Sequence, residues 1–85
     1  MTDDRKLKPV KLADPGEGLT EAMLVKYLVG VGDQVELLQP IALVETQKSV
    51  AEVTSPWAGR VTQTLIEPGE YLPVGASLLM VEVFE

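Results

Sequence analysis

Apolar and polar residues alternate with a period of two along most of the chain, which is the pattern of half-buried β-strands. The alternation is clearest at residues 23–29, 41–45, 50–54 and 78–82. Each run has the length of a strand and ends near residues that favour turns. Residues 19–28 come nearest to a helix, but their valine and tyrosine side chains favour a strand. The pattern predicts an all-β fold of closely spaced antiparallel strands, a flattened β-barrel or sandwich.

The chain partly repeats itself at a shift of 37 positions. Gly32-Asp33-Gln34-Val35 falls on Gly69-Glu70-Tyr71-Leu72, and residues 41–45 fall on residues 78–82 with similar size and polarity. Two copies are too few for a solenoid. We therefore expect a sandwich with pseudo-twofold symmetry, in which each half of the chain adds strands to both sheets.

The two halves are joined by Thr46-Gln47-Lys48-Ser49, which lies between two apolar runs and predicts a β-hairpin. The segment lacks the Asn-Gly or Asp-Gly pair of a type I′ turn, so a type I turn is expected, with Lys48 in water. An exposed lysine at a turn is ordinarily only a solvated charge. A primary amine on a flexible stem can nevertheless form an amide with a carboxylic cofactor, provided that a modifying enzyme activates the acid and removes the amine's proton. The symmetry predicts that Lys48 lies opposite both termini.

Composition limits the function. The 85 residues make one domain, without cysteine or histidine, so disulfides and the usual catalytic bases and metal ligands are excluded. We therefore expect a non-catalytic domain with no metal. The net charge of −6 argues against nucleic acid and anionic membranes as partners, and no apolar stretch is long enough to span a bilayer.

The chain ends suggest a domain cut from a longer protein. Residues 1–8 are polar and are expected to be a flexible segment before a domain at residues 9–85. They lack a secretory signal core or an organelle transit peptide, which predicts a cytoplasmic location, or the mitochondrial matrix for a processed protein. A flexible linker is expected after residue 85.

Four motifs occur in order along the chain, and together they resemble a known family. They are Gly16-Glu17-Gly18-Leu19-Thr20-Glu21-Ala22, Gly32-Asp33-Gln34-Val35, Glu45-Thr46-Gln47-Lys48-Ser49 and Ser55-Pro56-Trp57-Ala58-Gly59-Arg60-Val61. The chain resembles the lipoyl domain of the dihydrolipoyl acyltransferase (E2) component of 2-oxo-acid dehydrogenase complexes over residues 9–83. This family lies within the wider group of biotinyl and lipoyl attachment domains.

The resemblance implies two four-stranded sheets and a lipoic acid joined by an amide to Lys48. The group would be acylated at the decarboxylase (E1), would pass its acyl group to coenzyme A at the E2 catalytic domain, and would be reoxidised by dihydrolipoamide dehydrogenase (E3). A lipoyl ligase or lipoyl transferase would attach it, and the isolated domain is expected to be monomeric. Recognition is expected at two segments: Glu45, Thr46, Gln47 and Ser49 beside the lysine, and Gly16, Glu17, Gly18 and Leu19 in a neighbouring loop.

Some positions depart from the family pattern. Gln47 stands where an aspartate is usual, Ser49 where an alanine is frequent, and Tyr27 where a tryptophan is common. A biotin carrier domain is an alternative, although that family has methionines on both sides of its lysine. An unmodified lipoyl-like adaptor module is a second alternative. Three further glycines are interpreted as turn residues: Gly32, Gly59 and Gly69.

Overall fold

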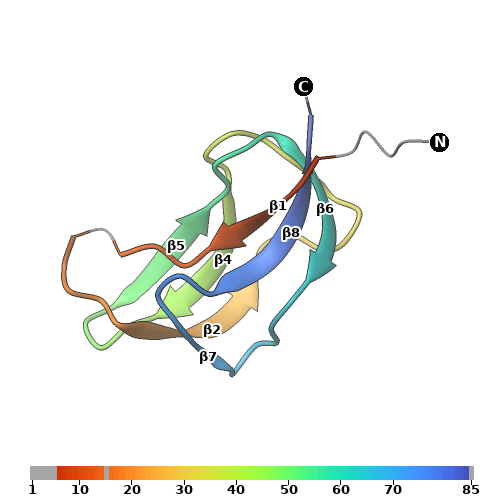
Figure 1. Cartoon of the computed structure of the whole chain (residues 1–85). Coiled ribbons are helices and arrows are strands. Elements are labelled where there is room, and N and C mark those ends of the chain that lie inside the picture. Colours follow the sequence, from red (N-terminus) through yellow and green to blue (C-terminus); the bar gives the residue numbers. More distant parts are fainter. Residues whose placement is uncertain (1–5, 15, 85) are drawn as a thin grey trace.

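The computed structural model describes residues 6–14 and 16–84, and all the regular structure within them is β-strand (Figure 1). The strands are β1 (Lys6–Lys11), β2 (Glu21–Tyr27), β3 (Gln34–Val35), β4 (Pro40–Glu45), β5 (Val50–Thr54), β6 (Gly59–Thr64), β7 (Tyr71–Pro73) and β8 (Ser77–Val83). They form two four-stranded antiparallel sheets, ordered β1-β8-β6-β3 and β5-β4-β2-β7. The all-β prediction is confirmed. Because the two sheets stay separate, the fold is a sandwich and not a closed barrel.

The internal repeat is confirmed as a pseudo-twofold relation between the sheets. Each strand of one sheet corresponds to the strand of the other sheet that lies four places away in chain order. Strands β1, β8, β6 and β3 thus correspond, in sheet order, to β5, β4, β2 and β7. The turns obey the same 37-residue shift. The Gly32 amide donates to the Val61 carbonyl at 2.8 Å, and the Gly69 amide donates to the Leu24 carbonyl at 2.7 Å. The repeat therefore specifies not only similar strands but also the same hydrogen bonds.

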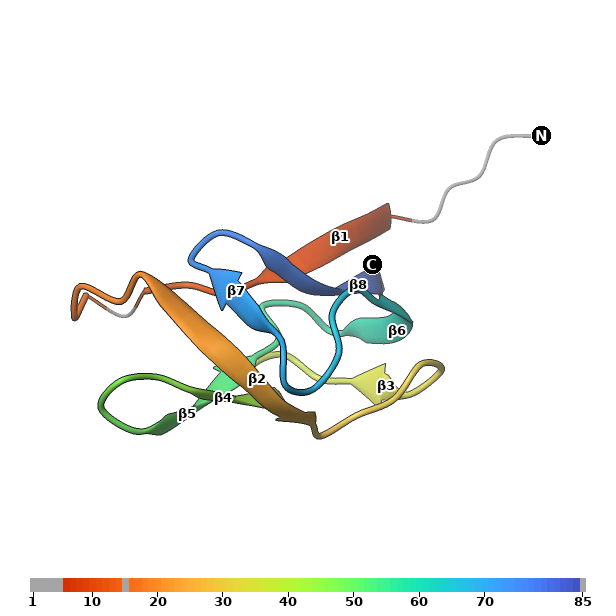
Figure 2. The ribbon, with the colours of Figure 1, turned by 90° about the horizontal axis from the view of Figure 1, so that it is seen from below.

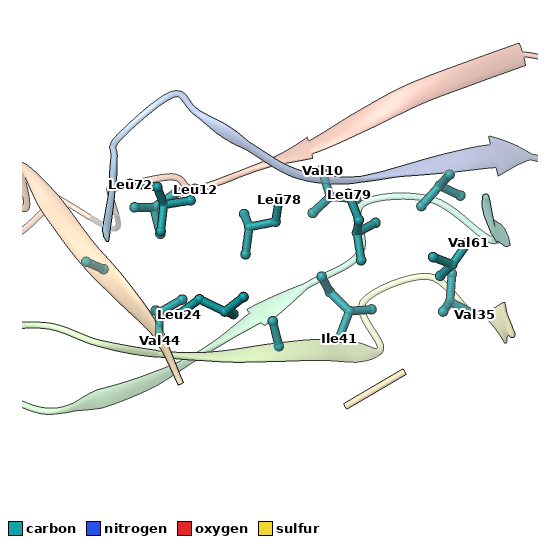
Figure 3. Close-up of a cluster of buried hydrophobic side chains, with 13 residues drawn as sticks. Val10, Leu12, Leu24, Val35, Ile41, Val44, Val61, Leu72, Leu78 and Leu79 are labelled. Carbon is teal, nitrogen blue, oxygen red and sulfur yellow. The ribbon is translucent and has the colours of Figure 1, made fainter. Parts of the chain in front are cut away.

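The hydrophobic core lies between the two sheets and draws on both halves of the chain (Figure 3). Leu24 and Ile41 come from the first half and Leu78 and Leu79 from the second, and all four are completely buried. Burial of each such side chain contributes about 1.5–3 kcal/mol to folding. The core thus joins the two halves into one folding unit.

Tyr27 links the sheets by polar contacts. Its hydroxyl lies 2.9 Å from the Ile66 carbonyl oxygen and 2.8 Å from the Leu78 carbonyl oxygen, and it donates its proton to either one. Burial of this hydroxyl raises the pKa of Tyr27. These contacts tie β2 in the first half of the chain to residues of the second half.

Two sequence-based expectations are corrected. Gly32 and Gly69 do occupy turns, with φ of 95° and 94°, but Gly59 is a buried residue at the start of β6. A Cβ at position 59 would overlap the Glu82 carbonyl oxygen and lie 2.6 Å from Val81 Cγ1, so the glycine is required by close packing. Strand β1 begins at Lys6, three residues before the expected domain boundary at residue 9. Residues 1–5 and 85 lie outside the described residues.

Leu38 has a positive φ of 66°, whereas its repeat partner 37 positions later is Gly75, with φ of 94°. A leucine in this left-handed region costs about 1 kcal/mol or more, and its side chain is 65% exposed, so little packing offsets the strain. We expect Leu38→Gly to raise the free energy of unfolding by about 0.5–1 kcal/mol in urea titrations. Gly75→Ala serves as the control and should lower it by about 1 kcal/mol, since nothing lies within 4 Å of the added Cβ and only backbone strain changes. A lower free energy of unfolding for Leu38→Gly than for the parent chain would contradict this expectation.

Candidate functional site

The turn between β4 and β5 is held by the side chain of Thr46. The pairing of the two strands ends at Glu45 and Val50, which leaves residues 46–49 as the tip of a hairpin. The Thr46 amide and hydroxyl both donate to the Ser49 carbonyl oxygen, at 2.8 and 2.9 Å. Thr46 Oγ1 in turn accepts from the amides of Ser49 at 3.1 Å and Lys48 at 3.2 Å. These bonds fix the backbone at the lysine.

None of the four turn residues, 46–49, has a positive φ, which excludes a type I′ turn and agrees with the type I turn expected from the sequence. Lys48 is exposed at the tip, and within the described residues no hydrogen bond or ion pair holds its ammonium group. Figure 1 shows this turn at the opposite end of the sandwich from the start of β1 and the end of β8. The hairpin therefore presents a primary amine at the tip of a fixed turn, at the other end of the sandwich from the start of β1 and the end of β8, as predicted.

The connection from β1 to β2 lies beside the lysine turn in both ribbon views (Figure 2). Asp14 organises it: Oδ1 accepts from the amides of Gly16 and Glu17, both at 2.9 Å, and Oδ2 accepts from the Gly18 amide at 3.2 Å. Gly16 and Gly18 have φ of 99° and 76°, in the left-handed region that favours glycine. The neighbouring Pro15 lies outside the described residues.

This loop should respond to acid. The amide of Glu17, followed by those of Gly16 and its neighbours, lowers the pKa of Asp14 because each bond favours the carboxylate. A lowered folded-state pKa stabilises the loop above the ordinary aspartate pKa, and this stabilisation is lost as the pH falls through the lowered value. We expect the amide NMR signals of Gly16 and Glu17 to shift with a midpoint below the usual aspartate range. In Asp14→Asn this titration should disappear, and its persistence would assign the transition to another group.

A groove of about 300 Å³ separates the loop from the hairpin. Its lining comes from three places: the end of β1, the β1–β2 loop, and the β4–β5 hairpin. Lys48 itself lines the groove, together with Thr46, Gln47 and Ser49 of the turn and Glu17, Gly18 and Leu19 of the loop. The structure therefore brings together the two segments in which the sequence placed the recognition residues.

The predicted recognition residues differ in their exposure. Glu45, Gln47 and Ser49 are exposed, whereas Thr46 is half-buried, in keeping with its role in the turn. Gly16, Glu17 and Gly18 are exposed, but Leu19 packs against the core. Leu19 therefore positions the loop as well as lining the groove.

Sequence reasoning missed the groove's apolar floor, which includes Leu12, Val44 and Val53. A signal was present in the repeat: the β1–β2 connection has nine residues, 12–20, while the equivalent β5–β6 connection has four, 55–58. The additional residues fall beside Lys48 and form one wall of the groove. The unequal loop lengths could have indicated a feature present at only one end of the pseudo-symmetric fold.

Within the part of the chain that the structure describes, no group of three or more acidic, cysteine or histidine side chains is placed to hold a metal ion. No helix in that part is long and apolar enough to cross a membrane.

Residues 8–81 match the model of the protein family described as biotin-requiring enzymes, the biotin and lipoyl attachment domains. This chain belongs to the biotin–lipoyl domain family. The match includes residues of all eight strands and the hairpin that carries Lys48.

Curated relatives of this biotin–lipoyl domain include components of dehydrogenase complexes. The chain is 42% identical over 74 residues to the lipoamide acyltransferase component of the branched-chain alpha-keto acid dehydrogenase complex of Pseudomonas aeruginosa. It is 41% identical over 73 residues to the dihydrolipoyllysine-residue acetyltransferase component of the pyruvate dehydrogenase complex of Mycoplasma capricolum. The matches cover 87% and 86% of this chain but only 17% of each relative, so the chain spans about a sixth of their length.

Solved structures of two kinds of protein confirm the fold. A single-chain, multi-domain long-chain acyl-CoA carboxylase matches with a TM-score of 0.76 and 16% identity, over 93% of this chain and 7% of that one. The lipoyl domain of the 2-oxoglutarate dehydrogenase complex of Azotobacter vinelandii matches with a TM-score of 0.62 and 20% identity, over 89% of this chain and 96% of that one.

Proposed function

We propose that this biotin–lipoyl domain carries lipoic acid in amide linkage to Lys48 and serves as the carrier domain of an acyltransferase in a 2-oxo-acid dehydrogenase complex. The observation that carries the proposal is the rigid hairpin with a free lysine at its tip, in a chain about 40% identical to two such acyltransferase components. The lipoyl group would supply the thiol chemistry of acyl transfer. The chain itself would supply position and recognition.

Lipoate is favoured over biotin by sequence and not by shape. The fold is shared with carboxylases, so the sandwich alone supports either group. The residues on each side of the lysine are Gln47 and Ser49, not the methionines expected of a biotin carrier. Relatives at 36–42% identity are acyltransferase components of dehydrogenase complexes.

The residues around Lys48 would hold and present the lipoyl-lysine side chain, here called the arm. The Thr46 hydroxyl fixes the turn, and the absence of histidine leaves the chain without the usual proton-transfer group, so catalysis would belong to the partners. Those partners would be the decarboxylase, the acyltransferase domain, dihydrolipoamide dehydrogenase and a lipoyl ligase or transferase. Attachment to one chain would raise the local concentration of the arm at each active site.

The test is the intact mass of the chain after incubation with lipoate, ATP and a lipoyl ligase, beside a Lys48→Arg version. We expect a gain of one lipoyl group in the parent chain and none in the variant. Arginine keeps the charge and exposure of residue 48 but is not acylated under these conditions. A parallel reaction with biotin and a biotin ligase should give no gain.

The other outcomes identify the alternatives. A biotinyl gain without a lipoyl gain would assign the domain to the carboxylases. No gain from either ligase, with the chain shown to be folded, would overturn the carrier proposal and support an unmodified adaptor module.

A further inference from the structure

The groove beside Lys48 has an apolar floor and a charged rim. Leu12 and Val44 are buried there, and Leu19 and Val53 are half-buried and pack against the core. Ala51 lies two residues before Val53 on β5, and therefore on the same face of the strand, but it remains exposed. An exposed apolar wall thus continues from the core to the lysine.

The position of the groove follows from the sheet topology. Strands β1 and β5 are each at the edge of a sheet, and the groove lies between the end of β1 and the inner face of β5. The long β1–β2 loop, fixed by Asp14, forms its remaining wall. Its volume of about 300 Å³ is at the lower limit of small-molecule pockets, enough for a short aliphatic group.

We propose, on the basis of the lipoyl linkage proposed above, that this groove holds the distal end of the arm when it carries a short, neutral aliphatic acyl group. Lys48 lines the groove itself, so an arm attached there can fold back without movement of the turn. The acyl group then lies against Leu19, Ala51 and Val53. The groove shields it from water and from unspecific nucleophiles until a partner withdraws it.

The charge of the rim determines the class of acyl group. The ionisable residues of the lining are Lys11, Glu17, Glu21, Lys48 and Glu52. Amide formation removes the charge of Lys48, which leaves one lysine against three carboxylates, a net charge of −2. An acyl group that ends in a carboxylate is therefore repelled, whereas acetyl or branched aliphatic acyl groups are not. The structure assigns the domain to acyl groups derived from 2-oxo acids without a second carboxylate.

The experiment compares two chemically prepared forms of the lipoylated chain, one S-isobutyrylated and one S-succinylated on the reduced arm. For the isobutyryl form we expect nuclear Overhauser effects between the acyl methyls and the methyls of Leu19 and Val53. An acyl group that spends two thirds of its time in the groove should also react with hydroxylamine about threefold more slowly than S-isobutyryl dihydrolipoamide in solution. The succinyl form should show neither effect.

Two matched variants locate the binding. Ala51→Glu places a carboxylate on the exposed wall of the groove and should abolish both effects. Ala58→Glu makes the same change at an exposed alanine in the β5–β6 connection, at the other end of the sandwich, and should preserve them. Backbone amide spectra establish that each variant keeps the fold.

The results separate this proposal from the proposed function. Normal lipoylation of Lys48 with no contacts and no protection of the isobutyryl group would overturn the groove proposal and leave the carrier function intact. Equal protection of the succinyl form would overturn the assignment of the acyl class. Failure of Lys48 to accept lipoate would overturn both.

Discussion

Replacement of Gly59 by alanine is expected to lower the free energy of unfolding by about 3 kcal/mol, although it adds only one methyl group. Gly59 is paired with Val35 on one side and Val83 on the other, so β6 cannot move away from either neighbour. The new Cβ would overlap the Glu82 carbonyl oxygen, which belongs to the backbone of β8 and cannot rotate aside. Because a domain of this size has a total stability of about 4–13 kcal/mol, the loss is a large fraction.

The measurement is thermal and urea unfolding of the variant, with a fall in Tm of more than about 10 °C expected. Ala22→Gly is the control, because Ala22 occupies the equivalent place in the other half of the repeat, where a Cβ is accommodated and buried. Loss of that buried methyl and gain of backbone freedom should cost about 1.5 kcal/mol. If Gly59→Ala cost no more than this control, close packing would not be the reason for the glycine.

The repeat made most of the fold predictable from the sequence. Strands β4 and β8 follow from alternation alone, and the 37-residue shift correctly paired the turns at Gly32 and Gly69. The symmetry also correctly predicted that the β4–β5 turn lies at the opposite end of the sandwich from the start of β1 and the end of β8. These features depend on local periodicity and turn chemistry, which a sequence carries directly.

Other features depend on contacts between distant segments and were not predictable. Strand β1 contains three lysines among its six residues and shows little alternation, and it is a strand because β8 pairs with it along its whole length. Gly59 was interpreted as a turn residue, whereas the constraint comes from the backbone of β8. The groove beside Lys48 requires the positions of β1, β5 and the loop together. Only the unequal lengths of the two equivalent loops could have indicated it.

Exchange of Gln47 and Lys48, by the paired substitutions Gln47→Lys and Lys48→Gln, is expected to reduce the initial rate of lipoylation at least about 100-fold. The exchange preserves composition, net charge and the Thr46 hydroxyl that holds the turn. It moves the lysine Cα by about 3.8 Å and turns its side chain to another side of the hairpin. A modifying enzyme that recognises a rigid turn has to bring an activated acyl group to the amine, and misplacement by about 1 Å already slows such reactions 100-fold.

The decisive control is Gln47→Lys alone, which places two exposed lysines side by side on the same turn. Peptide mapping by mass spectrometry should find the lipoyl group on Lys48 and none on residue 47, because only the former has the orientation fixed by the Thr46 hydroxyl. Lipoylation of residue 47 at a comparable rate, in either variant, would mean that the ligase selects any exposed amine at this end. The hairpin geometry would then provide access to the lysine but would not provide the selectivity that we infer from its hydrogen bonds.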